Sequence, residues 1–325
     1  MTRLPHTPLA RPTALLAFVV AASVIVAGCA VGLLSPDTPS GSSPVVPSGP
    51  AALASDAPGD SGAPEDNADP VPPSPSVPPF SPPPPLTPSA ATAGLVLHVP
   101  ILMYHRIIPP NLAGNSLASL VVSPELFTAQ MDALAAAGWH TITVAQLIAD
   151  LAAGRRPAPQ TFVITFDDGY DDGYSYALPI LKTHHFVATY YVVAGRIGNA
   201  PGPMQALTPD HLRALAAAGM EIGNHTFSHV ALPHYHGRQL TFQIVGASAF
   251  IHGLVGSAPT TLAYPFGRFD AAVEVEVQAA GIAIGLTTVE GARETWATRY
   301  ETPRVRVGPG TSPGGLLSLV SRAWP

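Results

Sequence analysis

The sequence predicts an α/β fold in which a parallel sheet closes into a barrel. From about residue 96 to residue 325, short β-branched or aromatic runs alternate with amphipathic helical stretches. About seven such strands over this length favour a barrel over an open sheet. Because function collects at the carboxyl ends of barrel strands, each candidate residue can be judged by its position relative to a strand end.

Apolar periodicity and helix-capping residues define the expected elements. Ser123, Thr143 and Thr208 are expected to cap helices, because their side-chain oxygens can accept from the free N–H groups of a first turn. The expected strands are 99–104, 161–166, 188–193, 220–223, 261–264, 282–287 and 304–307. The expected helices are 124–137, 144–153, 175–183, 209–218, 240–254, 271–280 and 316–322.

Residues 1–28 are predicted to be a secretory signal. Arg3 and Arg11 precede an apolar run over 13–26, which is too short for a comfortable membrane span. Cys29, the only cysteine, follows Val-Ala-Gly, and this segment resembles the bacterial lipobox, whose cysteine is acylated and becomes the mature N-terminus. The sequence therefore predicts an exported lipoprotein, anchored to the outer face of the cell membrane through acylated Cys29. An incidental cysteine beside an ordinary cleavage site is the alternative.

Residues 29–95 are predicted to be a disordered tether, and residues 96–325 a single globular domain. Eighteen of the 38 prolines fall between residues 35 and 91, where no apolar periodicity is present. Such a segment cannot bury enough surface to offset the entropy of ordering. A stalk stiffened by polyproline II would carry a domain away from a membrane surface.

The charge of the predicted domain is close to balanced. Only two of the 15 basic residues and six of the 21 acidic residues precede residue 96. With no basic block or basic helix face, the sequence argues against nucleic acid as a partner. A neutral polymer such as a polysaccharide fits better as a partner. We expect the protein itself to be a monomer.

The tetrapeptide Asp-Asp-Gly-Tyr occurs twice in succession, and only its first copy lies at an expected strand end. Asp167 and Asp168 directly follow the strand 161–166. Adjacent carboxylates cannot point the same way, so one could bind a metal while the other accepts a proton from water. A helix N-cap beside a solvated acid is the alternative. Asp171 and Asp172 are expected to begin the next helix, where acidic groups favour the positive end of its dipole.

Two histidines follow another expected strand end. His225 and His229 come after the strand 220–223, and their spacing places both on one face of a helical turn, close enough to share a metal. The zincin pattern would need glutamate at position 226, which is threonine, so a general base must come from elsewhere. Two imidazoles and a carboxylate leave positions open for water and substrate, as in catalytic metal sites.

Two further candidates lie at strand ends. His105 ends the first expected strand, where a structural histidine is the alternative. Tyr264-Pro-Phe-Gly ends a later strand, and because Pro265 has no N–H, Phe266 offers the next backbone donor at a turn that Gly267 opens. Such a donor can stabilise a developing oxyanion, although an ordinary turn would look the same.

These motifs resemble those of the polysaccharide deacetylases, carbohydrate esterase family 4. Thr165-Phe-Asp-Asp-Gly-Tyr and His225-Thr-Phe-Ser-His are similar to the first two family motifs, and the resemblance runs from about residue 100 to residue 307. It implies a distorted (β/α)7 barrel, the NodB-homology fold, with a divalent metal that is usually Zn2+, with Co2+, Ni2+ or Fe2+ as alternatives. It also implies that Asp167 is the general base and that Asp168, His225 and His229 are metal ligands.

The third motif departs from the commonest family pattern. Many members carry an arginine-containing segment that ends Pro-Tyr, whereas this chain has Ala263-Tyr-Pro-Phe-Gly, and it lacks a late Leu-x-His that would supply an acid. The branch acting on poly-N-acetylglucosamine is similar, since a Tyr-His near its domain start provides the acid. This resemblance implies His105 as the general acid, and Arg304 as the substitute for the arginine that orients the base.

The sequence thus predicts a metal-dependent hydrolase that removes N-acetyl groups from an N-acetylglucosamine-containing cell-surface polysaccharide and releases acetate. The polymer could be poly-N-acetylglucosamine, peptidoglycan or a chitin-like chain. An O-acetyl esterase on xylan or another glycan, and a catalytically inactive wall-binding lipoprotein, are the alternatives. A 2-His-1-carboxylate iron oxygenase uses similar ligands, but its His-x-Asp spacing is absent and the β/α alternation does not suit its usual all-β scaffold.

Overall fold

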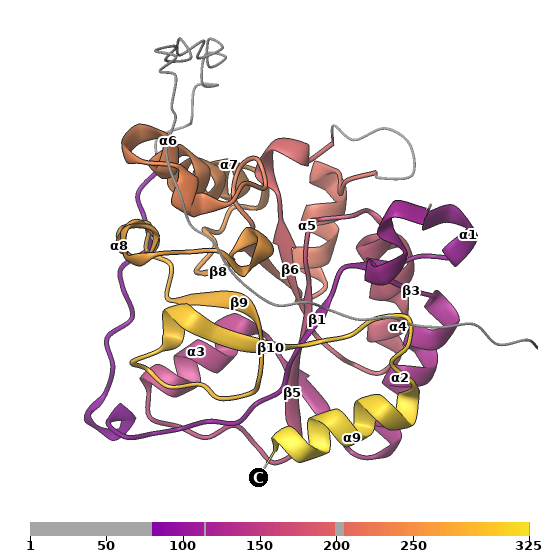
Figure 1. The fold of residues 1–325 in the computed structure, drawn as a ribbon. Helices are drawn as coiled ribbons and strands as arrows, with labels where there is room; N and C mark the ends of the chain where they lie inside the picture. Colours follow the sequence, from indigo (N-terminus) through magenta and orange to yellow (C-terminus); the bar gives the residue numbers. More distant parts are fainter. Residues whose placement is uncertain (1–79, 114, 199–204, 325) are drawn as a thin grey trace, which may run out of the picture. The chain divides into compact units, whose positions relative to one another are not determined.

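The computed structural model describes residues 80–113, 115–198 and 205–324 (Figure 1). The predicted secretory segment 1–28, Cys29 and the tether up to residue 79 lie outside the described residues. Within the described part of the chain, no helix is both long enough and apolar enough to cross a membrane.

Seven parallel strands of the described chain form a closed ring (Figure 1). Their order around the ring follows their order in the sequence, and β1 pairs with both β5 and β10, which closes the barrel. The predicted α/β barrel is therefore confirmed. Its strands are β1 (Ile101–Tyr104), β5 (Thr161–Phe166), β6 (Thr189–Val192), β7 (Glu221–Asn224), β8 (Thr261–Ala263), β9 (Ile284–Glu290) and β10 (Thr302–Arg306).

Helices follow the strands on the outside of the ring (Figure 1). The three predicted caps are confirmed, because the side chains of Ser123, Thr143 and Thr208 each accept a hydrogen bond from the first turn of the following helix. The principal helices are α2 (Pro124–Ala136), α3 (Val144–Ala152), α4 (Leu178–Thr183), α5 (Pro209–Ala217), α7 (Ala247–Val255), α8 (Ala271–Ala279) and α9 (Pro313–Ala323).

Several short elements differ from the predicted ones. The helix predicted over 240–254 is divided by a π-helical turn, and the helix predicted over 175–183 begins with another. Such turns depend on packing, and strands of two or three residues carry too little periodicity to be recognised. The additional elements are β2 (Arg106–Ile107), β3 (Val121–Val122), β4 (His140–Ile142), α1 (Pro110–Ala113) and α6 (Gly237–Thr241), with π-helical turns at Gly173–Ala177 and Phe242–Gly246.

Strand β5 shows how the barrel is filled on both sides. All six of its residues are buried, as expected for a parallel strand covered on both faces. Val163 packs in a cluster with Tyr191 of β6, whereas Phe162 and Phe166 pack in another with the outer helices. Because side chains alternate between the faces, Asp167 continues the row of Val163 into the barrel interior.

The folded part of the chain begins before residue 96. The Ser89 N–H donates to the Ala152 carbonyl at the end of α3 (2.8 Å), and the buried Thr92 hydroxyl donates to the same oxygen (2.7 Å). Leu97 then forms an antiparallel bridge with Glu294. The last residues of the segment predicted as a tether are thus attached to the barrel.

Glu294 is a buried carboxyl group that fastens this leading segment. Its side chain is 1 % exposed, and Oε2 accepts from the Val99 N–H (3.0 Å), while Oε1 has no hydrogen-bond partner among the described residues. Burial, opposed by the hydrogen bond from Val99, raises the pKa of Glu294 to about 8. Glu294 is therefore protonated at neutral pH in the folded chain.

We expect stability to fall as the pH rises through this range. The folded pKa of Glu294 lies above the unfolded value, so the folded state holds a proton that the unfolded state releases between about pH 4.5 and pH 8. The contribution of protonated Glu294 to the free energy of unfolding is complete below that pH window and is lost as the pH rises through it. Urea unfolding at pH 5 and pH 8.5 should show a smaller decrease in the free energy of unfolding between the two pH values for Glu294→Gln than for the native chain. Equal losses in the two proteins would contradict this role.

Candidate active site

The predicted site residues converge at one end of the barrel. His105 follows β1, Asp167 and Asp168 follow β5, His225 follows β7, and Phe266 follows β8. These are carboxyl ends of parallel strands in one ring, where barrel enzymes place their active sites.

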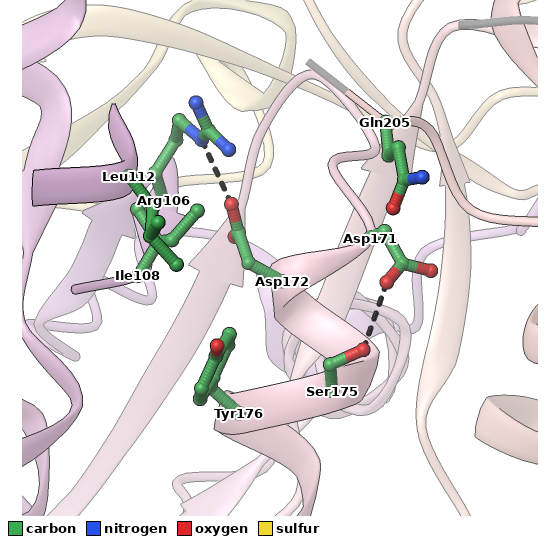
Figure 2. A pocket seen from close by; sticks show the side chains of 8 residues that line it. All are labelled: Arg106, Ile108, Leu112, Asp171, Asp172, Ser175, Tyr176 and Gln205. Carbon is green, nitrogen blue, oxygen red and sulfur yellow. Dashed lines mark hydrogen bonds and ion pairs between the residues drawn. The ribbon is translucent and has the colours of Figure 1, made fainter. Parts of the chain in front are cut away.

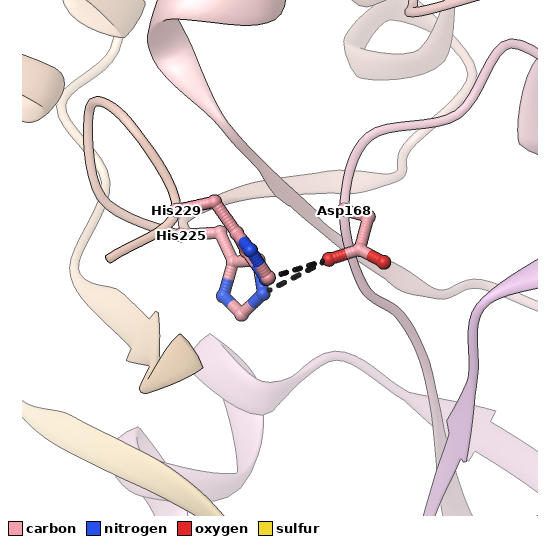
Figure 3. A group of neighbouring side chains, drawn as sticks. All are labelled: Asp168, His225 and His229. Atoms are coloured by element: carbon pink, nitrogen blue, oxygen red, sulfur yellow. Dashed lines mark ion pairs between the residues drawn. The ribbon is translucent and has the colours of Figure 1, made fainter. Parts of the chain in front are cut away.

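Asp168, His225 and His229 form a compact group of potential metal ligands (Figure 3). Asp168 Oδ1 lies 3.4 Å from His225 Nε2 and 3.0 Å from His229 Nε2, and one ligand atom from each residue lies within 4.8 Å of the others. Among the described residues this is the one such group of histidine, cysteine and acidic side chains. Two imidazole nitrogens and a carboxylate oxygen suit a divalent metal and leave positions for water and substrate.

Hydrogen bonds hold these side chains in a metal-competent state. His225 Nδ1 lies 2.7 Å from the Ala263 carbonyl oxygen, so Nδ1 carries the proton and Nε2 keeps its lone pair. Burial on its own would raise the pKa of Asp168, but the neighbouring rings of His225 and His229 outweigh it and hold the pKa well below its usual value. Asp168 is therefore ionised at neutral pH, the state in which a carboxylate can bind a metal.

The two histidines lie on a loop, and the predicted helical turn between them is wrong. The Asn224 side-chain oxygen accepts from the Thr226 N–H (2.7 Å), and the Thr226 hydroxyl accepts from the His229 N–H (2.9 Å). Asn224 is itself fixed by its amide group, which donates to the Ile244 carbonyl (2.9 Å). These side-chain bonds replace helical backbone bonds, as Asn and Thr often do in turns.

Thr226 is fully buried and should control metal affinity through His229. We expect Thr226→Val to lower zinc affinity by about tenfold or more, because the His229 N–H loses its acceptor and the ligand loses its support. Competition with a chromophoric chelator would measure this. Thr226→Ser keeps the hydroxyl and serves as the control. Affinity at the native level in Thr226→Val would contradict the role.

Left-handed backbone is concentrated at this site. Of the six described non-glycine residues with positive φ, four are Asp168 (72°), Thr226 (67°), His229 (57°) and Phe266 (61°). Gly169, with φ of 69°, continues the sharp exit from β5, and a Cβ there would approach the Val192 Cα at 3.2 Å. Such conformations cost about 1–3 kcal/mol each and persist where the surrounding structure fixes them.

Asp167 faces Arg304 inside the barrel in a bidentate ion pair. Arg304 Nη1 and Nη2 donate to Asp167 Oδ1 (2.8 Å) and Oδ2 (2.7 Å), and both side chains are nearly inaccessible, at 0 % and 3 % exposed. Arg304 lies in the middle of β10, two residues inside the start of the strand, and its Nε donates to the Thr287 carbonyl (2.8 Å). The guanidinium group thus connects β5, β9 and β10.

This pair keeps Asp167 ionised. Burial on its own would raise the pKa of Asp167, but the charge and hydrogen bonds of Arg304 outweigh it and hold the pKa below its ordinary value. Each carboxylate oxygen has a second lone pair that the arginine does not use. Asp167 can therefore accept a proton from a substrate or water while Arg304 fixes its orientation.

His105 and Phe266 border the same space. Burial lowers the pKa of His105, and the nearby carboxylates of Asp167 and Asp168 partly oppose this effect. The Phe266 ring lies edge-on to His229 with 4.8 Å between centroids, and its side chain is exposed. The left-handed turn continues at Gly267 (φ 67°), where a Cβ would overlap Thr288.

Asp171 and Asp172, the second Asp-Asp pair, are predicted to begin a helix, but Asp172 instead bonds to a distant part of the chain. Asp172 is 4 % exposed; Oδ2 accepts from Arg106 Nε (2.8 Å), and Oδ1 accepts from the Ile107 N–H (3.0 Å) (Figure 2). It makes no capping hydrogen bond to the following turn. Burial raises the pKa of Asp172, and Arg106 opposes this effect. Asp172 thus ties the chain directly after His105 to the loop after β5.

Comparisons with known proteins agree with the fold and the motifs. Residues 154–285 match the polysaccharide deacetylase family; this segment contains both motifs and Phe266, whereas His105 and Arg304 lie outside it. The deacetylase PplD of Streptococcus pyogenes, solved in complex with acetate, has a TM-score of 0.62 and 27% identity, with 68% of this chain and 97% of that chain covered.

Two relatives are similar in sequence. One is a peptidoglycan-N-acetylglucosamine deacetylase of Bacillus cereus, 30% identical over 106 residues, or 32% of this chain and 36% of that protein. The other is YxkH of Bacillus subtilis (strain 168), named as a polysaccharide deacetylase, which is 32% identical over 214 residues, or 66% of this chain and 73% of the relative. The extent of this match, with both motifs in place, shows that the chain belongs to the polysaccharide deacetylase family of hydrolases.

Proposed function

We propose that this protein is a metal-dependent deacetylase that removes N-acetyl groups from an N-acetylglucosamine-containing cell-surface polysaccharide. The observation that carries the proposal is the juxtaposition at one barrel rim of a three-ligand group and an ionised carboxylate. Asp168, His225 and His229 supply the ligands, and Asp167, oriented by Arg304, supplies the carboxylate. A base and a metal site at one position are the parts that amide hydrolysis requires.

Asp168, His225 and His229 would hold the metal, which we propose to be zinc. Bound there, a divalent ion supplies Lewis-acid polarisation of an acetyl carbonyl and lowers the pKa of water. The mixed nitrogen and oxygen donors, and the Nε2 lone pair that the Ala263 carbonyl secures on His225, fit such an ion.

The other residues then have complementary roles. Asp167 takes the proton from the attacking water, and Arg304 keeps its carboxylate ionised and aimed. The Phe266 backbone N–H stabilises the oxyanion that develops on the former acetyl carbonyl. His105, which follows β1, gives a proton to the nitrogen as the carbon–nitrogen bond breaks. Because burial lowers its pKa, His105 must be protonated beforehand, and the charges of Asp167 and Asp168 favour that form. The products are acetate and a free amine.

The proposed substrate rests on two observations. One relative is a deacetylase of N-acetylglucosamine in peptidoglycan. The predicted domain also has nearly balanced charge, which suits a neutral polymer. An O-acetyl esterase would use the same residues, but only removal of an N-acetyl group creates a primary amine.

Purified protein tests this proposal directly. Zinc-loaded and chelator-treated samples should be incubated with N-acetylglucosamine oligomers, peptidoglycan and acetylxylan, with acetate and primary amines both measured. We expect metal-dependent acetate release from an N-acetylated polymer, with one amine for each acetate. Acetate from acetylxylan alone, without amines, would overturn the substrate assignment.

We also propose that Cys29 anchors the protein to the outer face of the cell membrane. The support is the Val-Ala-Gly-Cys segment behind an apolar run and ahead of a proline-rich stretch. In a lipoprotein-processing bacterial host, the native chain should sediment with membranes, and Cys29→Ser should be released to the soluble fraction. Equal membrane association of both would overturn the anchor.

A further inference from the structure

The loop of residues 225–229, which carries both histidine ligands, has a partner for each of its backbone N–H groups (Figure 3). Three of these groups donate to β6 or to side chains of the loop and its preceding strand. The other two, from Phe227 and Ser228, both donate to one residue outside the loop, Gln243. A single helical residue therefore holds the middle of the loop.

Gln243 makes these contacts through both its backbone and its side chain. Its carbonyl oxygen accepts from the Phe227 N–H (2.9 Å), and its Oε1 accepts from the Ser228 N–H (2.9 Å). Its Nε2 lies 3.4 Å from the Ser228 hydroxyl oxygen, which adds a longer hydrogen bond. Because Gln243 is 6 % exposed, little water can compete for these groups, and the bonds fix the orientation of its amide.

The π-helical turn Phe242–Gly246 supplies the two carbonyl groups that reach the loop and its preceding strand. It lies between α6 and α7 and includes Gln243 and Ile244. The Ile244 carbonyl accepts from the Asn224 side-chain amide (2.9 Å), while the Gln243 carbonyl serves the loop itself. An α-helical carbonyl normally faces the N–H four residues later, and a wider turn changes this alignment. Such turns are rare and recur at functional sites.

His229 depends on this support more than His225 does. His225 Nδ1 bonds to the Ala263 carbonyl (2.7 Å), which fixes its ring. Within the described part of the chain, His229 Nδ1 has no such hydrogen-bond partner, and the His229 backbone has a positive φ of 57°. The position of the His229 ring is therefore set by the backbone of the loop, in which the preceding Ser228 is held by Gln243.

We propose that Gln243 is a positioning residue for the metal ligand His229 and sets the metal affinity of the site. It acts through the N–H groups of Phe227 and Ser228, which hold the loop in the conformation that places His229 Nε2 3.0 Å from Asp168. The inference rests on the proposed metal site and extends it to a helix that contributes no ligand. Removal of such outer contacts lowers metal affinity by about 10–100-fold.

Gln243→Leu tests this role, because leucine is similar in size but cannot accept from the Ser228 N–H. Ser228 is exposed, so water can bond to the freed N–H and the variant should fold. The matched control is Gln130→Leu on α2, a buried glutamine whose amide bonds to the Tyr104 hydroxyl and the Thr311 carbonyl. A second control, Ser228→Ala, removes the hydroxyl but keeps the N–H bond to Gln243.

Competition with a chromophoric chelator measures zinc affinity, and the visible spectrum of the Co2+-loaded protein reports the geometry of the ligands. We expect Gln243→Leu to lower zinc affinity by about tenfold and to change the Co2+ spectrum. Gln130→Leu should lose stability in urea without either change, and Ser228→Ala should keep the native affinity and spectrum. Native values in Gln243→Leu, or an equal loss of affinity in Gln130→Leu, would overturn the role of Gln243.

A measurement on the metal-free protein separates this inference from the proposed function. Amide hydrogen exchange of Ser228, followed by NMR spectroscopy, should be about tenfold faster in Gln243→Leu than in the native chain, because the amide has lost its acceptor. Unchanged exchange would overturn the positioning role. A native protein that released no acetate would instead overturn the proposed function, while the zinc affinities and the exchange rates would still decide the role of Gln243.

Discussion

Asp167→Asn should reduce acetate release by about 10²–10⁴-fold while zinc affinity stays near its native value. The carboxylate that accepts the proton is lost, but Asp168, His225 and His229 are unchanged. Turnover of an N-acetylglucosamine pentamer measures catalysis, and competition with a chelator measures zinc affinity independently. Substantial turnover by this variant would contradict the assignment of Asp167 as base.

The buried Arg304 complicates this experiment, and a control is needed. An asparagine amide can accept only one of the two hydrogen bonds that Arg304 donates, so the variant should also lose stability. Circular dichroism and urea unfolding establish the folded fraction at the assay temperature. Asp171→Asn, a change in the second Asp-Asp pair, should keep turnover close to the native level once turnover is expressed per folded molecule.

Asp172→Ala should be the more destabilising change of the second Asp-Asp pair. Removal of Asp172 leaves the buried Arg106 guanidinium without its carboxylate, at a cost of about 3–5 kcal/mol. Asp171→Ala breaks contacts with half-buried His211 and exposed Ser175 and should cost about 1 kcal/mol or less. The free energy of unfolding in urea measures both.

A double substitution separates the buried charge from general damage to the fold. Replacing the pair by Arg106→Met and Asp172→Leu removes both charges, so it should recover much of the stability that Asp172→Ala loses. Equal losses for Asp171→Ala and Asp172→Ala would contradict the structural role of the ion pair.

The barrel and the location of its site could be predicted because both depend on local patterns. Apolar runs separated by capped helices define parallel strands, and residues directly after such runs must meet at one rim. The positions of Asp167, Asp168 and His105 follow from this alone. The same reasoning places Phe266 at the rim, while the roles of these residues stay predictions.

Other features depend on contacts between distant parts of the chain. The His225–His229 spacing suggests a helical turn, but Asn224 and Thr226 bond the backbone in a loop instead. The Arg106–Asp172 ion pair joins residues 66 positions apart, which no local pattern reveals. In the second Asp-Asp pair, composition suggests a solvated helix start, yet burial makes one of its acids structural.

The most direct test of the central claim is the product analysis of zinc-loaded protein with the N-acetylglucosamine pentamer. We predict equal amounts of acetate and primary amine, loss of both after chelation, recovery on adding zinc, and about 10²–10⁴-fold slower release of both from Asp167→Asn. Acetate release that survives complete metal removal, or that proceeds normally in Asp167→Asn, would contradict a metal-dependent deacetylase built on Asp168, His225, His229 and Asp167.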